Sequence, residues 1–186
     1  MQIVTRNLRF LKGHLVTLVW RLRGARIADR IVVDGITPHL HLRGRLELGS
    51  RVYFRGHGLG SRIAIGREGI LSIGDRCFLN GGCRLNASRS VTLGANTMIG
   101  ESVEIGDMAY HEVDEGHGTA IKPVTIGRNV WIANGARIMP GVTIGDHSVV
   151  AAGAVVTKSF PDRCLIAGVP ARKIRDVFAS DGYVRT

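Results

Sequence analysis

A six-residue repeat between Ile126 and Val156 constrains the fold of this chain more than any other feature. A period of six fits neither an α-helix, with 3.6 residues per turn, nor a strand, which alternates every two residues. It is typical of a parallel β-helix, in which each rung is a short strand followed by a turn. One large side chain then points inward in each rung, and a small one fills the corner. The first-place and fifth-place residues are Ile126, Ile132, Ile138, Ile144, Val150 and Val156, and Val130, Ala136, Val142, Ser148 and Ala154.

Upstream of this repeat, aliphatic residues keep a related rhythm. From Ile65 to Ile105 their spacings are 8, 6, 6, 8, 6 and 6, which indicates coils of three rungs with a triangular cross-section. The residues are Ile65, Ile73, Leu79, Leu85, Leu93, Ile99 and Ile105. We therefore expect an all-β chain in three parts: an N-terminal basic amphipathic helix within residues 1–30, the β-helix over 31–165, and a C-terminal segment with a short helix over 166–186.

Composition narrows the choice of partner. The chain has 25 glycines and few aromatic residues, which is typical of turn-dense β repeats. Lysine plus arginine exceed aspartate plus glutamate by 25 − 15 = 10, and this surplus favours a phosphorylated cofactor or an anionic membrane surface. Nucleic acid is disfavoured, because no nucleic-acid-binding motif occurs and aromatic residues for base stacking are scarce.

The three cysteines and the apolar segments indicate the cellular compartment of the protein. Cys77 and Cys83 fall at fifth places of rungs and are interpreted as small core residues, while Cys164 lies near the end of the coil. An odd number of cysteines without a disulfide framework indicates a reducing compartment. No run approaches the ~20 apolar residues of a membrane span, and no signal-peptide cleavage site follows the N-terminal apolar stretch. We expect a cytoplasmic protein.

Residues 5–27 have the pattern of a basic amphipathic helix. Leucines recur at spacings of three and four, Val16, Val19 and Trp20 widen the apolar side, and basic residues flank it. This helix could cap the open end of the coil or pack on a partner subunit. It could also lie on the anionic inner face of the cytoplasmic membrane. The leucines and the basic residues are Leu8, Leu11, Leu15, Leu18 and Leu22, and Arg6, Arg9, Lys12, Arg21, Arg23 and Arg26.

The rhythm breaks after Ile105, because the next rung in register begins only at Ile126. The surplus segment, residues 107–122, is polar, charged and rich in glycine. A loop ejected from an otherwise closed repeat is where functional residues are expected. This loop contains two histidines, His111 and His117.

The repeats, the loop with His111, and the ending A-G-V-P-A-R-K-I-R together resemble the hexapeptide-repeat acetyltransferases over roughly residues 65–175. The chain is most similar to the branch of maltose, galactoside and nodulation O-acetyltransferases and their polysaccharide-modifying relatives. The resemblance implies a left-handed parallel β-helix. It also implies a homotrimer that binds acetyl-CoA, as the donor substrate, in the groove between neighbouring subunits.

The resemblance also implies a histidine that takes a proton from the acceptor hydroxyl, which suits the ordinary imidazole pKa. We assign this general base to His111, with His117 as the rival. The family's Thr-His-Pro is replaced here by Tyr110-His111-Glu112, and counting rungs places the family histidine on Tyr110. We expect Tyr110, Glu112 and Asn80 on the acceptor side. Glu112 or Asp107 could orient the imidazole.

For acetyl-CoA, the resemblance points to an outward tryptophan, to small residues along the pantetheine arm, and to cations for the phosphates. Arginine forks and lysine suit phosphate groups. Two of these arginines, Arg172 and Arg175, are expected on one side of a helical turn after Pro170. The full set is Trp131, Asn134, Gly135, Ala152, Gly153, Thr157, Lys158, Arg172 and Arg175.

The sequence therefore predicts an acetyl-CoA-dependent O-acetyltransferase that acts on a hydroxyl of a sugar or cell-surface glycan precursor and needs no metal. A xenobiotic (antibiotic) O-acetyltransferase is the alternative within the same class. Two other classes use this fold. One is a γ-type carbonic anhydrase, with His57, His111 and His117 as candidate zinc ligands, and the other is a non-catalytic scaffold.

Overall fold

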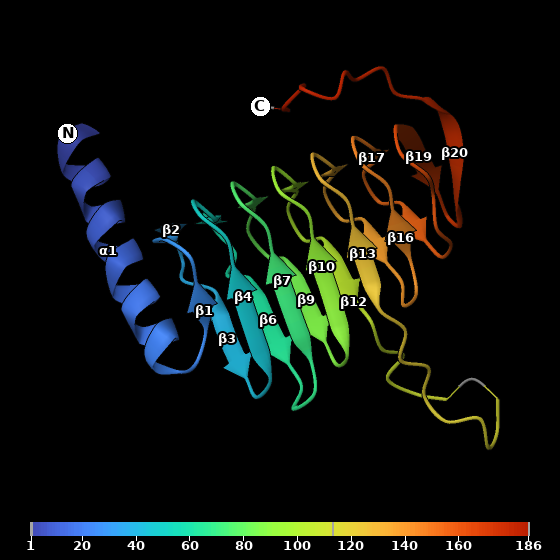
Figure 1. Ribbon diagram of the computed structural model, residues 1–186, viewed down its shortest axis with the longest axis horizontal. Helices are drawn as coiled ribbons and strands as arrows, with labels where there is room; N and C mark the ends of the chain where they lie inside the picture. The colour runs from blue at the N-terminus through green and yellow to red at the C-terminus, as the bar shows by residue number, and fades with distance from the viewer. Residues whose placement is uncertain (1, 113, 186) are drawn as a thin grey trace.

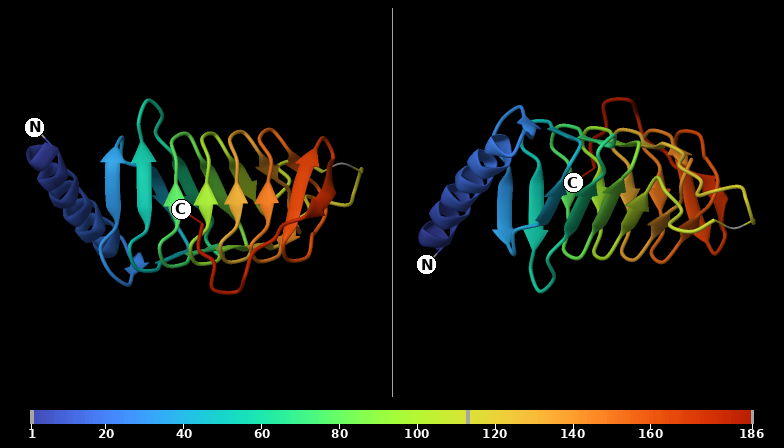
Figure 2. Two further views of the ribbon diagram at one scale, coloured as in Figure 1. Left: turned by 90° about the horizontal axis from the view of Figure 1, so that it is seen from above. Right: turned by 90° about the horizontal axis from the view of Figure 1, so that it is seen from below.

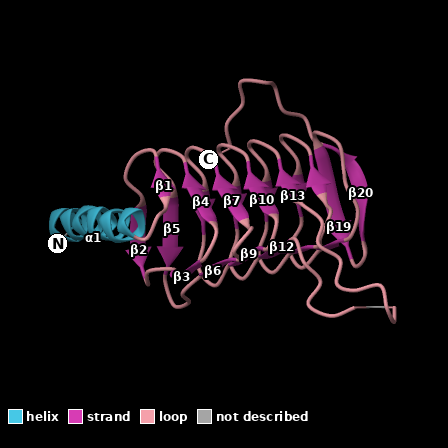
Figure 3. Cartoon of the chain, turned by 60° about the horizontal axis from the view of Figure 1, so that its bottom comes forward, coloured by secondary structure: helices cyan, strands magenta, loops and turns pink. Residues whose placement is uncertain are grey.

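The computed structural model describes residues 2–112 and 114–185, which form a parallel β-helix of about six turns preceded by an α-helix (Figure 1). Each coil contributes one strand to each of three sheets, A, B and C, so the predicted triangular cross-section is confirmed. Strands of successive coils lie side by side along the stack (Figure 3).

The three sheets hold six, eight and six strands. Sheet A consists of β1 (Arg26–Ile27), β4 (Arg45–Leu48), β7 (Ile70–Ile73), β10 (Ser90–Leu93), β13 (Val124–Ile126) and β16 (Thr143–Ile144). Sheet B consists of β2 (Val32–Gly35), β5 (Tyr53–Gly56), β8 (Phe78–Leu79), β11 (Met98–Ile99), β14 (Trp131–Ile132), β17 (Val149–Val150), β19 (Cys164–Gly168) and β20 (Ala171–Asp176). Sheet C consists of β3 (His39–Leu42), β6 (Arg62–Ile65), β9 (Arg84–Ala87), β12 (Glu104–Gly106), β15 (Arg137–Ile138) and β18 (Val155–Val156).

The core is the one that the repeat predicts. All first-place and fifth-place side chains between residues 126 and 156 are buried. Cys77 and Cys83 are buried in the same stack, and burial raises the pKa of both thiols to about 11, so they are neutral core residues. One detail of the spacing is wrong: Ile63, and not Ile65, pairs with Leu85 in sheet C.

The N-terminal helix α1 (Gln2–Leu22) caps the open end of the coil (Figure 2). Gly13, Thr17 and Trp20 are buried against it, and the Trp20 ring meets the Phe54 ring edge-on at 5.8 Å between centroids. The main-chain N–H of Ile31 donates to Thr17 Oγ1 at 3.1 Å. The capping interpretation is therefore confirmed.

The boundaries of the helix differ from those predicted. The helix ends at Leu22, four residues before β1 begins, so the coil starts within the segment assigned to residues 1–30. Leu8 and Arg6 lie outside the side chains that the structure describes.

The predicted short C-terminal helix is wrong. Residues 164–176 form the strands β19 and β20, an antiparallel pair that extends sheet B beyond its last full coil. A terminal coil leaves a sheet edge with unpaired main-chain groups, and a further hairpin satisfies them. Gly168 adopts a φ of +103° at the turn of this hairpin. The tail then runs back along the corner between sheets A and B, where the Asn129 amide donates to the Tyr183 carbonyl at 2.8 Å.

Candidate functional site

The candidate site residues lie at the two corners that flank sheet C. Asn80 follows β8, and Asn134 follows β14, so both stand at the corner between sheets B and C. The loop with His111 follows β12, and Lys158 follows β18, so these stand at the opposite corner, between sheets C and A. The structure thus places the two halves of the predicted site at opposite edges of one sheet.

The ejected loop is confirmed. Its base is closed by Lys122, whose N–H donates to the Asp107 carbonyl at 2.8 Å, and by an isolated antiparallel bridge between Met108 and Ile121. Beyond this base the described loop residues are largely exposed, and the loop projects away from the coil (Figure 1). The rest of the coil continues in register on either side, with β10 pairing directly with β13.

Asp107 anchors the base of the loop. Its carboxylate is fully buried and accepts three main-chain N–H groups, from Ser88 at 2.7 Å, Arg89 at 2.6 Å and Ser90 at 2.7 Å. All three donors come from the preceding coil at the same corner. Since Asp107 is committed to these donors, it does not orient His111 in this structure.

His111 is exposed on the loop, and among the described residues neither acid considered as its partner bonds to it. Glu112 Oε2 instead accepts the N–H of Gly118 at 3.1 Å. The rival histidine, His117, is also exposed, and its Nδ1 lies 3.2 Å from the Glu115 carbonyl oxygen. Both histidine side chains are therefore accessible to a substrate or to another subunit.

Tyr110 lies beside a pocket of ≈ 800 Å³ over sheet C. Burial raises the pKa of its hydroxyl, Glu104 and Asp107 raise it further, and Arg84 acts against them. The hydroxyl therefore stays protonated at neutral pH and can donate a hydrogen bond. The pocket is lined by Leu59, Gly60, Arg62, Gly82, Cys83, Arg84, Asn86, Ser102, Glu104, Tyr110, Gly135 and Arg137.

A column of charged residues forms the wall of this pocket on sheet C. Arg62, Arg84, Glu104 and Arg137 occupy the same position on four successive coils. Arg137 pairs with Glu104 at 3.9 Å, but within the described ranges no ion pair joins Arg62 or Arg84 to an acid. Arg62 and Arg84 stand on directly opposed strand positions, so their two positive charges add and this part of the pocket is electropositive.

Sequence reasoning missed this column. Arg84, Glu104 and Arg137 each stand directly before the inward aliphatic residue of a rung, so aligning the rungs could have revealed the column. Arg62 precedes Ile63, which the sequence analysis did not include in the rhythm.

At the corner between sheets B and C, the predicted small residues form one exposed strip. Gly135 and Gly153 both have φ of +68°, which favours glycine, and no atom lies within 4 Å of where a Cβ would be. Ala152 is exposed beside them. The Asn134 side chain also links two coils, because its Oδ1 accepts the N–H of Glu101 at 3.0 Å. Asn80 is held similarly, since its Oδ1 accepts the N–H of Gly81 at 2.9 Å.

Three of the predicted CoA residues lie on sheet B. Trp131 is 42% exposed on β14 and is flanked by Met98 and Val149 on the neighbouring strands. Arg172 and Arg175 are exposed on β20, and not on the helical turn predicted after Pro170, because that segment pairs with β19. Among the residues that the structure describes, each of their guanidinium groups bonds a nearby main-chain carbonyl and no acid.

Thr157 and Lys158 lie apart from the other predicted CoA residues, at the corner between sheets C and A. Both are exposed, and the Lys158 ammonium lies 5.8 Å from the centre of the Phe160 ring. One chain therefore does not bring all nine CoA candidates onto a single surface.

Comparison with known proteins identifies the family. Residues 123–158 match the model described as bacterial transferase hexapeptide (six repeats). The chain is 39% identical over 135 residues to the galactoside O-acetyltransferase of Escherichia coli (strain K12), a match covering 71% of this chain and 61% of that protein. A hexapeptide-repeat acetyltransferase from Vibrio cholerae, solved with acetyl coenzyme A, superposes with a TM-score of 0.60 at 30% identity, over 70% of each chain. The chain belongs to the hexapeptide-repeat acetyltransferases.

A further member of known structure, described as a polySia-specific acetyltransferase, matches this hexapeptide-repeat acetyltransferase with a TM-score of 0.58 at 25% identity. That match covers 86% of this chain and 78% of the other. The chain spans 61% of the length of the galactoside relative. The resemblance stated from the repeats and the C-terminal motif is thus confirmed at the level of the family.

In the described part of the chain, the three histidines considered as zinc ligands do not form one group. His57 follows β5 on sheet B, where its Nε2 lies 3.2 Å from Asp34 Oδ2, whereas His111 and His117 lie on the loop beyond sheet C. Across residues 2–112 and 114–185, no three His, Cys, Asp or Glu side chains are grouped so that they could hold a metal ion.

Proposed function

We propose that this protein transfers the acetyl group of acetyl-CoA to a hydroxyl of a glycan, with His111 as general base. The observation that carries the proposal is the ejected loop, which carries His111 next to Tyr110, a residue that lines the pocket over sheet C, on a fold whose relatives are acetyltransferases. An inactive scaffold has no need of a loop anchored by a buried carboxylate.

The reaction needs a base and a donor of hydrogen bonds. Neutral His111 takes the proton of the acceptor hydroxyl as its oxygen attacks the thioester carbonyl carbon. The carbonyl oxygen becomes an oxyanion, which a protonated hydroxyl such as that of Tyr110 can stabilise. The intermediate then releases the CoA thiolate, which recovers the proton from the imidazolium. No acyl-enzyme forms, because both substrates are held together.

The site would be shared between subunits of a homotrimer. His111 and Asn80 lie at opposite corners of sheet C, and the CoA candidates divide between these two corners and sheet B. In a closed ring of identical chains, one corner of each chain faces the other corner of its neighbour. Such a ring would join the loop and Lys158 of one chain to the small-residue strip and Trp131 of the next.

The acceptor we infer is an acidic glycan. Arg62 and Arg84 place two guanidinium groups without acidic partners, among the described residues, beside Tyr110. Arginine forks match carboxylate and phosphate groups. The similarity to a polySia-specific acetyltransferase supports this class, because polysialic acid carries carboxylates. The basic pocket favours such a glycan over neutral sugars and over cationic antibiotics.

The decisive experiment measures CoA release from acetyl-CoA with a panel of neutral and acidic glycans. We expect His111→Ala to lower kcat by about 10²- to 10⁴-fold, the usual contribution of a general base. His117→Ala, in the same exposed loop, is the matched control and should keep near wild-type turnover. Full activity of His111→Ala would move the base to another residue. Absence of both turnover and acetyl-CoA binding in the wild type would favour the scaffold instead.

A further inference from the structure

Helix α1 has two faces of opposite character. The face toward the coil is formed by Gly13, Thr17 and Trp20, and it approaches so closely that a Cβ on Gly13 would stand 2.3 Å from the Ile31 carbonyl oxygen. The opposite face, which we call the leucine face, is apolar and exposed. It consists of Leu11, Leu15, Leu18 and Leu22, which are 71%, 61%, 56% and 79% exposed.

Capping of the coil does not account for the leucine face. The four leucines follow spacings of four, three and four, so they form one continuous stripe along the helix, and Val19 adjoins it at 42% exposure. None of them belongs to the core of the coil. A contiguous apolar stripe left in water is unfavourable, and its presence indicates a partner surface.

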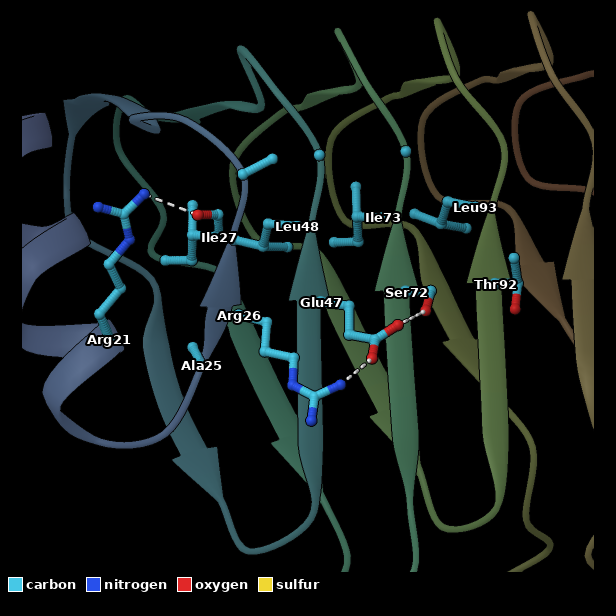
Figure 4. A pocket seen from close by; sticks show the side chains of 13 residues that line it. Arg21, Ala25, Arg26, Ile27, Glu47, Leu48, Ser72, Ile73, Thr92 and Leu93 are labelled. Carbon is cyan, nitrogen blue, oxygen red and sulfur yellow. Dashed lines mark hydrogen bonds and ion pairs between the residues drawn. The ribbon is translucent and has the colours of Figure 1, made fainter.

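A cluster of arginines stands beside the Leu22 end of the helix. The arginine cluster, Arg26, Arg43, Arg45 and Arg67, lines a pocket of ≈ 400 Å³ together with Gly24 and one acid, the exposed Glu68. Figure 4 shows the neighbouring surface of sheet A, where Arg26 is paired with Glu47 at 3.5 Å. Within the described part of the chain, no ion pair involves Arg43, Arg45 or Arg67, and all three are exposed.

We propose that the leucine face and the arginine cluster together dock the protein on an anionic phospholipid bilayer. The leucines would enter the boundary between headgroups and acyl chains, and the arginines would bind lipid phosphates. No helix of the described residues is long and apolar enough to cross a membrane, so α1 would lie along the interface. Docking would place the protein at the membrane surface, independently of which acceptor it acetylates.

Charge favours a bilayer over a second copy of the chain. Helix α1 contains no aspartate or glutamate, and its neighbours in the arginine cluster are cationic. The acids beside the cluster are Glu68 and Glu47, and Glu47 is paired with Arg26, so positive charge is in excess there. Two leucine faces packed together would bring the surplus cations of both copies close to one another. An anionic lipid surface supplies the missing charge and also covers the leucines.

The test is flotation of the full-length protein with vesicles of phosphatidylglycerol and phosphatidylcholine, compared with phosphatidylcholine alone. We expect the wild type to float with the anionic vesicles, and Leu15→Glu/Leu18→Glu to abolish flotation. Arg43→Gln/Arg67→Gln should lower the partition coefficient roughly 25-fold, because each arginine contributes about fivefold. Phe178→Glu, at a 98% exposed position near the other end of the coil, is the matched control and should float normally.

Two companion measurements keep the outcomes distinct. Acetyl transfer to a soluble acceptor should be unchanged in Leu15→Glu/Leu18→Glu, which separates docking from the proposed activity. Sedimentation should show the same oligomeric state in this variant and in the wild type. The proposal is overturned if the wild type ignores anionic vesicles, or if the leucine substitutions leave flotation intact. Dissociation of the oligomer by those substitutions, without vesicle binding by the wild type, would assign the leucine face to a second copy.

Discussion

Asp107 shows how a single buried carboxylate fixes the place where the loop leaves the coil. Its replacement by alanine leaves the N–H groups of Ser88, Arg89 and Ser90 without their acceptor. We expect Asp107→Ala to lower the free energy of unfolding by on the order of 3 kcal/mol. Denaturant titration measures this, with Asp114→Ala in the exposed loop as control. A stability equal to that of the wild type would mean that the anchor is dispensable.

His147 makes stability depend on pH. It is fully buried, and the Asn129 amide donates to its Nδ1 at 2.8 Å, which leaves the proton on Nε2. Burial lowers its pKa below the ordinary 6.5, and Arg128 and Arg163 lower it further. As the pH falls, His147 takes up a proton in the unfolded chain at a higher pH than in the folded chain. The contribution of His147 to the free energy of unfolding is therefore complete above pH 6.5 and declines as the pH falls below it.

The measurement is the free energy of unfolding between pH 7.5 and 5, compared between the wild type and His147→Gln. We expect the variant to lose part of the slope below pH 6.5, because glutamine cannot take up the proton. His41→Gln, at an exposed position, should keep the wild-type slope. Identical slopes for all three proteins would show that His147 does not control the loss of stability at low pH.

At the scale of single elements, the charged column on sheet C should decide between acceptors. Arg84 stands between Arg62 and Glu104 and faces the pocket beside Tyr110. We expect Arg84→Gln to raise KM for an acidic glycan by about tenfold, the loss of one charge-assisted hydrogen bond, with little change in kcat. With a neutral acceptor, KM should hardly move. Steady-state kinetics with both acceptors tests this, and equal effects on both would contradict a role in charge recognition.

The hydrophobic pattern of the sequence predicted those strands whose inward face is buried by neighbouring coils. The period of six located the core, because each inward residue is enclosed by its own coil and its two neighbours. The C-terminal strand was missed, since Arg172 and Arg175 stand three apart as on a helix, and only the open edge of sheet B selects a strand. For α1, the leucine spacing predicted the helix but not its buried face. The helix must approach the main chain at the end of the coil closely, and the small side chains at Gly13 and Thr17 allow this whereas leucines do not.

At the scale of the whole molecule, the sequence suggested candidate site residues but not where they lie relative to one another. His111 became a candidate because a broken period indicates an ejected loop, which is a local signal. The separation of His111 from Asn80 by the width of sheet C depends on how coils stack. In a single chain, the candidate residues of the proposed site lie at two corners of sheet C and on sheet B. The proposed shared site therefore predicts that assembly, as well as folding, is a condition for activity.

Complementation between two inactive variants tests that condition directly. His111→Ala and Asn80→Ala chains, each nearly inactive alone, would be co-expressed with different tags and the mixed oligomers purified. If each site takes His111 from one chain and Asn80 from its neighbour, one of the three sites in every mixed trimer holds both intact residues. Turnover of the purified mixed trimers should then recover to about a third of the wild-type value per site. If the site lay within one chain, no chain in the mixture would hold both residues, and turnover would stay at the level of the separate variants.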